Sequence, residues 1–391
     1  VVVDWDVRHG NGTESIFLDD PNVLTISLHQ DRLYPHTTGD VDVVGVGTNI
    51  NIPLPPGTGH GGYYYAFDEV IIPAFTIISC VHQIIRRGAI PVLIDCDSNT
   101  WNMDTALIES RISTRTRAIL VVHIYGLPTN MADIERITQQ HGLFLIEDAA
   151  EAHGLSFDGR PCGSFGDVST FSFYPNKLIT TGEGGAVFVK SPLVKKQVES
   201  FRDWGRDCYC VGTNNLLECG TCGKRFDNWL PNYDGVIDHK YLFTTMGYNL
   251  KPLDLQGAIG IEQLKKFDYI DKKRREYKLV IQKYLEDNIK EIRVINPLPN
   301  GDPSWFGVPI YCESQDVKEF LVQHFEGNKI QTRNYFSGNI LLHPGYKHLD
   351  NYKDYPNSNL ALSNVFFLGC SPLYNEKVLS YIEEVCKKWN D

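Results

Sequence analysis

From Ile71 onward, the chain alternates between segments with helical periodicity and short apolar runs typical of strands. Three predicted helices each lead into a predicted strand. The pairs are Ser79–Arg87 with Pro91–Asp95, Asp104–Arg111 with Ala118–His123, and Met131–His141 with Leu143–Asp148. Helices between short strands predict a mostly parallel sheet covered on both faces, with ligands at the carboxyl ends of its strands.

The C-terminal part is predicted to be a small α+β domain. Before it come a strand at Ala186–Val189, a helix at Leu193–Phe201, a long cysteine-rich loop over 202–240, and helices at Leu253–Leu264 and Lys272–Leu285. The end of the chain predicts a strand at Phe306–Tyr311, a helix at Gln315–His324, a strand at Lys329–Arg333 and a helix at Glu376–Trp389. We therefore place one domain over 71–267 and a second over 268–391.

Residues 1–70 have a different composition and pattern, with Gly, Pro, Asn and Asp between short apolar strands such as Val23–His29. The sequence starts without Met at Val1-Val2-Val3, inside what resembles a buried strand. We expect this front segment to be a fragment of another fold.

Composition and charge exclude several classes of protein. The chain has 391 residues, 42% hydrophobic and 22% charged, as in ordinary globular proteins. Its net charge of −11 argues against a nucleic-acid partner, which needs a basic surface. No apolar run is long enough to span a membrane, and no signal peptide is visible. The ten cysteines do not form a short secreted disulfide framework, so we expect a cytoplasmic protein.

The strongest chemical pattern joins an acidic strand end to a later lysine. Asp148 ends the predicted strand in Ile146–Gly154, and Lys177 ends the stretch Phe171–Lys177, which is followed by a glycine-rich turn. Pyridoxal phosphate (PLP) chemistry needs a lysine that bonds to the cofactor and a carboxylate that keeps its pyridine nitrogen protonated. Asp148 and Lys177 suit these roles, and Ser172 suits the phosphate.

These motifs, with Ile71–Thr76, Gly88–Val92 and His123–Gly126, resemble the DegT/DnrJ/StrS family of sugar aminotransferases. The resemblance implies a fold-type I PLP-dependent transferase, normally a homodimer with active sites at the subunit interface. It implies that Lys177 forms the Schiff base, Asp148 contacts the pyridine nitrogen and Ser172 binds the phosphate. It also places Glu151 near the cofactor hydroxyl, and matches Asn249 to an asparagine that reaches the neighbouring subunit's phosphate.

From Arg202 onward, the chain is more similar to the CDP-6-deoxyhexulose 3-dehydrase branch of the same family, through stretches such as Arg202–Cys210 and Pro303–Gly307. Those dehydrases have histidine at the position of Lys177 and a cluster-binding cysteine at that of Ala150. Because lysine supplies the amine that transamination uses, the resemblance implies an aminotransferase. We expect a nucleotide-linked keto-deoxysugar substrate, glutamate as the amino donor, and a role in cell-surface polysaccharide or lipopolysaccharide synthesis. A dehydrase that carries an iron–sulfur cluster is the alternative.

Four cysteines crowd into the predicted loop as C-x-C-x8-C-x2-C, at Cys208, Cys210, Cys219 and Cys222. Four thiolates suit zinc or an iron–sulfur cluster, and Cys219 is a candidate replacement for the ligand missing at Ala150. The alternative is that they are metal-free thiols.

The front segment resembles the histone deacetylase and acetylpolyamine amidohydrolase family, through Asp4–Thr13, Leu24–His29 and Pro53–Gly61. The resemblance implies zinc ligands at Asp6 and at position 8, which is normally a histidine in that family. This chain has Arg8 there, which offers no lone pair, so we expect no deacetylase activity. The front also lacks the Gly-Thr turn and helix start that hold the PLP phosphate in sugar aminotransferases. Ile77 stands where their ring-stacking aromatic is expected. A fusion protein without activity is therefore a further alternative.

Overall fold

A computed structural model describes residues 2–4, 25–30, 49–54, 68–208, 223–230, 232–336 and 338–390. The chain divides into two compact units. One contains Val1–Leu120, Arg136–Phe144 and Phe336–Leu362, and the other contains Val121–Glu135, Leu145–Tyr335 and Ser363–Asp391. The domain boundaries at 70 and 267 stay predictions.

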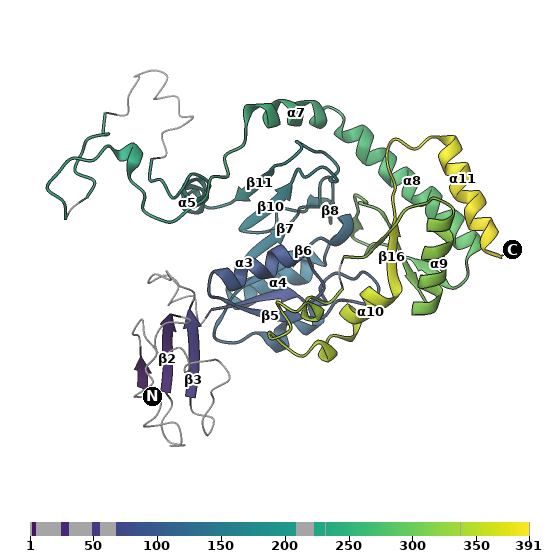
Figure 1. Cartoon of the computed structure of the whole chain (residues 1–391), viewed down its shortest axis with the longest axis horizontal. Helices are drawn as coiled ribbons and strands as arrows, with labels where there is room; N and C mark the ends of the chain where they lie inside the picture. Colours follow the sequence, from purple (N-terminus) through teal and green to yellow (C-terminus); the bar gives the residue numbers. More distant parts are fainter. Residues whose placement is uncertain are drawn as a thin grey trace. The chain divides into compact units, whose positions relative to one another are not determined.

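The front segment forms a small parallel sheet of three strands in the order β1-β2-β3 (Figure 1). Its strands are β1 (Val2–Asp4), β2 (Thr25–Gln30) and β3 (Asn49–Leu54), with Ile26 opposite Ile50. The strand predicted at Val23–His29 therefore corresponds to β2.

A helix and two parallel strands open the aminotransferase-like part. β4 (Glu69–Pro73) pairs parallel with β5 (Ile90–Ile94), and α3 (Ile78–Arg86) connects them. Cys80, Val81 and Ile84 are the buried residues of α3, because a spacing of three and four places them on one helix face. A parallel pair needs such a crossover, so the predicted α/β pattern is confirmed here.

The main sheet has six strands in the order β11-β10-β7-β6-β4-β5. It adds β6 (Thr116–Val122), β7 (Phe144–Asp148), β10 (Val168–Ser172) and β11 (Gly185–Val189). β10 runs parallel to β7 and antiparallel to β11, so the sheet is mixed but mostly parallel. The helix predicted at Met131–His141 is α4, with the same bounds.

The prediction of one continuous helix at Asp104–Arg111 is wrong. The structure has two 3-10 turns there, η1 (Thr105–Leu107) and η2 (Glu109–Arg111). The Asp104 side chain accepts the Ala106 N–H at 3.0 Å, which begins a tight turn. Ile108 is the one buried residue of the segment, so there is no apolar face along which an α-helix would pack.

The C-terminal part contains an antiparallel sheet in the order β12-β14-β16-β15. Its strands are β12 (Ile292–Val294), β14 (Val308–Cys312), β16 (Val365–Leu368) and β15 (Thr332–Asn334). The helices α8 (Phe267–Asn288) and α9 (Gln315–Gly327) both contact β14, and α11 (Glu376–Lys387) lies along α8 (Figure 1). The predicted small α+β region is therefore present.

Shorter elements complete the described chain. They are the sheet of β13 (Gly301–Asp302), β8 (Ser156–Phe157) and β9 (Arg160–Pro161), the helices α5 (Pro192–Arg202), α7 (Asp254–Leu264) and α10 (Pro356–Asn364), and the 3-10 turns η3 (Ile124–Gly126), η4 (His239–Tyr241), η5 (Ile340–Leu342), η6 (Tyr352–Asp354) and η7 (Lys388–Asn390). Among the described residues, no helix is long and apolar enough to cross a membrane.

Candidate active site

Lys177 lies in the turn that follows β10, where its backbone N–H donates to the Tyr174 carbonyl at 3.0 Å. Its Nζ is 2.9 Å from Glu151 Oε1, and its side chain is 14% exposed. The Nζ also lies 5.1 Å from the centroid of the Phe306 ring, within the range of a cation–π contact. The amine is thus held between a carboxylate and an aromatic ring, with limited access to solvent.

Glu151 is buried and uses its two oxygens differently. Oε1 contacts Lys177, whereas Oε2 accepts the Tyr125 backbone N–H at 3.0 Å. Burial raises the pKa of Glu151, although the Lys177 ammonium and the Tyr125 N–H act to lower it, and the Asp148 carboxylate adds to the rise. A carboxylate with a raised pKa accepts a proton more readily than one in water.

Tyr125 has a backbone φ of 55°, in the left-handed region that bulky residues rarely adopt. Its ring stacks on that of Tyr335, with centroids 4.2 Å apart, and meets the rings of Phe306 and Phe367 edge-on. Its hydroxyl donates to the Asn334 carbonyl at 3.3 Å. Residues from β15, β16 and the turn before β14 therefore hold Tyr125 in the conformation that directs its N–H at Glu151.

Asp148 and Ser172 are the last residues of β7 and β10. These strands run parallel, with Asp148 opposite Thr170, so both side chains lie at the same edge of the sheet. Asp148 Oδ1 accepts the Ala150 N–H at 3.0 Å, and Ser172 Oγ accepts the Tyr174 N–H at 3.3 Å. The predicted carboxylate and hydroxyl are therefore at a strand edge where ligands bind in this class of fold.

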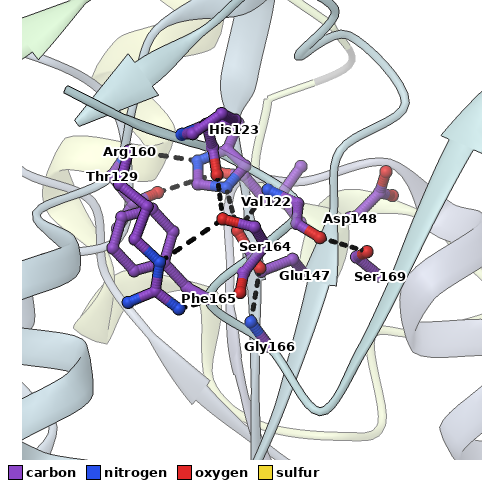
Figure 2. Close-up of polar contacts among 12 residues, drawn as sticks. Val122, His123, Thr129, Glu147, Asp148, Arg160, Ser164, Phe165, Gly166 and Ser169 are labelled. Atoms are coloured by element: carbon purple, nitrogen blue, oxygen red, sulfur yellow. Dashed lines mark hydrogen bonds and ion pairs between the residues drawn. The ribbon is translucent and has the colours of Figure 1, made fainter. Parts of the chain in front are cut away.

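A buried polar network lies beside this edge (Figure 2). His123 Nε2 is 3.0 Å from Glu147 Oε2, and both side chains are fully buried. Glu147 also accepts the backbone N–H groups of Gly163 at 2.7 Å and Gly166 at 2.5 Å. Burial acts to raise the pKa of Glu147, but these three donors lower it below its ordinary value, so Glu147 is an ionised carboxylate.

The network also fixes the end of β7. Thr129 N lies 3.3 Å from His123 Nδ1, which holds the ring with Nε2 directed at Glu147. The His123 backbone N–H donates to the Asp148 carbonyl at 3.2 Å. His123 and Glu147 therefore position the backbone from which the Asp148 side chain extends.

His153 is a site residue that the sequence patterns did not single out. It is buried, and its ring lies 5.4 Å from that of Phe171 and 5.7 Å from that of Phe173. Neither ring nitrogen has a hydrogen-bond partner among the described residues. Burial, with a smaller effect of Lys177, lowers the pKa of His153 to about 4, so its imidazole is neutral at pH 7. It is a buried polar group next to Lys177 with unused hydrogen-bonding capacity.

The remaining predicted residues lie elsewhere. The structure gives Asn249 an exposed side chain, and its backbone forms a β-bridge with Asp203. Within the described ranges, no contact joins Asn249 to the Lys177–Glu151 pair. Ile77 precedes α3 and is 38% exposed.

Of the predicted cysteine ligands, Cys208 is a half-buried free thiol, and Cys210, Cys219 and Cys222 lie outside the described residues. Within the residues that are described, no group of His, Cys, Asp and Glu is arranged to hold a metal ion. The cysteine site stays a prediction.

Residues 64–387 match the DegT/DnrJ/EryC1/StrS aminotransferase family. The chain belongs to this family. Residues 1–83 also match the histone deacetylase domain, which agrees with the resemblance of the front segment. The two matches overlap over residues 64–83, which contain β4 and the first part of α3.

The chain is similar to several proteins of this family, among them two curated relatives and one solved structure. The lipopolysaccharide biosynthesis protein RfbH of Salmonella typhimurium is 38% identical, over 81% of this chain and 72% of that protein. The dTDP-4-dehydro-2,6-dideoxy-D-glucose 3-dehydratase of Saccharopolyspora spinosa is 36% identical, over 81% and 68%. The Escherichia coli GDP-4-keto-6-deoxy-D-mannose-3-dehydratase with bound hydrated PLP has a TM-score of 0.69 at 24% identity, covering 84% of this chain and 86% of that one.

The fold is therefore that of the fold-type I PLP-dependent transferases, with a mostly parallel sheet and a small α+β part, as predicted. The family is one of sugar aminotransferases and dehydratases of nucleotide-sugar biosynthesis, and PLP is its cofactor. The residues at the strand edge fit the ring of PLP, because an amine, a strand-end carboxylate and a hydroxyl occur there with a neutral imidazole that has no hydrogen-bond partner among the described residues.

Proposed function

We propose that this chain is a cytoplasmic PLP-dependent aminotransferase that passes an amino group from glutamate to a nucleotide-linked keto-deoxysugar. The proposal depends most on one observation: Lys177, in the turn after β10, places its amine beside the Glu151 carboxylate. The similarity to RfbH supports a role in lipopolysaccharide or related cell-surface sugar synthesis.

PLP, when bound, stabilises the negative charge that develops as a proton leaves the neighbouring carbon. Lys177 Nζ would hold the cofactor and move that proton, since an amine is a competent base at this position. The Asp148 carboxylate would keep the pyridine nitrogen protonated, and the Ser172 hydroxyl would donate to the phosphate. Glu151 would lie near the cofactor hydroxyl and also contact Lys177.

Dehydration is the competing reaction. It is favoured by the identity of 36% to a sugar 3-dehydratase. The resemblance to dehydrases implies a histidine at position 177 and a cysteine at position 150 for that chemistry, whereas this chain has Lys177 and Ala150. Lysine is the group that transamination uses, so we favour aminotransfer.

Product analysis separates the alternatives. The full chain is incubated with PLP, glutamate and an NDP-4-keto-6-deoxysugar, and the products are identified by mass. Aminotransfer gives 2-oxoglutarate and an amino sugar, whereas dehydration gives a sugar that has lost a hydroxyl group. If the folded chain binds PLP and yields neither product from this sugar, the result favours a fusion protein without activity.

We also propose a homodimer, because a large apolar surface is exposed on the single chain. α7 buries none of its residues, and Leu250, Leu253 and Leu255 are each about two-thirds exposed. Exposed patches of this kind mark interaction sites. Light scattering should give twice the chain mass of 44.3 kDa, and Leu255→Glu should shift it towards the monomer. A monomeric wild-type protein would contradict the proposal.

For the cysteine-rich loop, we propose a thiolate metal site formed by Cys208, Cys210, Cys219 and Cys222, with zinc and iron–sulfur both open. Metal analysis of protein purified without air should then find metal, and Cys219→Ser should reduce it. A folded chain without metal would leave the thiols metal-free. A metal content in Cys219→Ser equal to that of wild type would show that Cys219 is not a ligand.

A further inference from the structure

We propose that Glu151 and Lys177 share a single proton, so that Lys177 changes between ammonium and amine by exchange with Glu151 rather than with solvent. This inference rests on the proposed function, because it assigns a proton-holding role to a residue that would otherwise only line the cofactor. Glu151 acts through Lys177 and is therefore a positioning residue.

The contact geometry supports a direct exchange. Glu151 Oε1 lies 2.9 Å from Lys177 Nζ, and their side chains are 8% and 14% exposed. Within the described part of the chain, Glu151 is the one carboxylate that lies within 4.0 Å of this amine. Solvent therefore has limited access to the proton between the two groups.

Tyr125 keeps Oε1 directed at the amine. Its backbone N–H binds Oε2, and the left-handed conformation that makes this possible is held by the Tyr335 ring and the aromatic groups around it. A carboxylate fixed at one oxygen does not turn away from its partner when the proton moves. This is the preorganisation that a rapid proton exchange requires.

The exchange is balanced within the pair. One N–H bond of the Lys177 ammonium breaks, and one O–H bond forms on Glu151 Oε1. The ammonium and carboxylate become an amine and a carboxylic acid, so the net charge of the pair stays at zero. Burial penalises the two ions and not the two neutral groups, which brings the two forms closer in free energy than in water.

Two other titratable groups face the pair. Asp148 is near enough to raise the pKa of Glu151, and this favours the protonated acid. His153 has a pKa of about 4 and so carries no charge between pH 6 and 8. In this pH range the shared proton is therefore the one expected to move.

The test measures how fast Lys177 is acetylated by acetic anhydride in the full chain freed of PLP. The absolute rate at each pH is followed by peptide mass spectrometry and corrected for hydrolysis of the reagent. If the pair shares one proton, the fraction of neutral amine is constant, and the wild-type acetylation rate of Lys177 should vary less than about twofold between pH 6 and 8. Glu151→Gln keeps an oxygen for the Tyr125 N–H but cannot take the proton.

In Glu151→Gln the Lys177 amine has no partner that can take its proton, so its acetylation rate should rise steeply with pH. The exposed Glu183→Gln, in the turn before β11, is the matched control and should behave like wild type. A wild-type rate that rises about tenfold per pH unit overturns the proposal, because it means a fixed ion pair. A flat rate in Glu151→Gln also overturns it. As a second readout, wild type should show an infrared band of a protonated carboxyl at neutral pH that Glu151→Gln loses, and its absence overturns the proposal.

In the presence of PLP and substrates, Glu151→Gln should lower kcat at least tenfold and leave KM within about threefold. This outcome is separable from failure of the proposed function. A chain that binds no PLP at Lys177 refutes the aminotransferase, whereas the acetylation profile is measured without PLP and tests the proton pair alone.

Discussion

Lys278 should make the stability of the protein depend on pH in a specific direction. This lysine on α8 is 1% exposed, and its Nζ donates to Gln282 Oε1 at 2.6 Å and to Asn296 Oδ1 at 3.3 Å. It also lies 4.1 Å from the centroid of the Trp305 ring. Burial lowers its pKa from 10.5 to about 8, although Glu286 and Cys370 act to raise it.

The sign follows from the lowered pKa. Below pH 8, Lys278 is protonated in the folded and the unfolded chain, and the folded state carries the full cost of a buried ammonium. Between pH 8 and 10.5, only the unfolded chain keeps the proton, so stability rises with pH. Each pH unit is worth about 1.4 kcal/mol, which gives a rise of about 3 kcal/mol from this one group.

Urea denaturation of wild type and Lys278→Met, followed by tryptophan fluorescence at several pH values, measures this effect. The free energy of unfolding of wild type, relative to the variant, should increase by about 3 kcal/mol between pH 7.5 and 10.5. Lys283→Met, on the exposed side of the same helix, controls for the loss of a lysine. If the stability of wild type relative to Lys278→Met does not change with pH, then Lys278 is not a buried lysine with a lowered pKa.

Three further predictions concern the active site and the front segment. Asp148→Asn should still bind some PLP by absorbance but lose most turnover, and near-wild-type rates would exclude Asp148 as the pyridine partner. Glu147→Gln should lower the free energy of unfolding by about 2–3 kcal/mol, because its amide group would face a backbone donor. As a control, Glu135→Gln, at a half-exposed position, should lower it by less than about 1 kcal/mol. Equal losses in a chemical denaturation series would contradict this account. The full chain should not hydrolyse acetyl-lysine peptides or acetylpolyamines, and zinc-dependent hydrolysis that disappears in Asp6→Asn would show otherwise.

The sequence patterns predicted long, strongly periodic elements well and short buried ones poorly. The helix at Met131–His141 has the predicted bounds because its apolar spacing is regular. β16 (Val365–Leu368) was missed, since four consecutive buried residues in the middle of a sheet show no alternation. α10, which precedes it, was also missed because Pro356–Asn364 has no clear apolar face.

The candidate site was predictable in its parts but not in its contacts. Lys177 and Glu151 were both named from motifs, yet their separation of 26 residues gives no sign that they touch. The left-handed backbone of Tyr125 cannot be read from a residue type that rarely adopts it. Phe306 and Tyr335 reach this region through the folding of the C-terminal strands, which local patterns do not encode. His153 lies inside the Ile146–Gly154 motif. Its burial and its lack of a hydrogen-bond partner among the described residues, which mark it as a site residue, depend on the fold and cannot be read from the sequence.

The site at which PLP attaches covalently decides whether Lys177 is the cofactor lysine. The full chain is mixed with PLP, reduced with borohydride, digested and analysed by mass spectrometry, with Lys177→Ala as the control. We expect visible absorbance before reduction and a pyridoxyl group on the peptide that contains Lys177, and neither in the variant. Attachment to another lysine, or an unchanged visible spectrum in Lys177→Ala, would contradict the assignment of this active site.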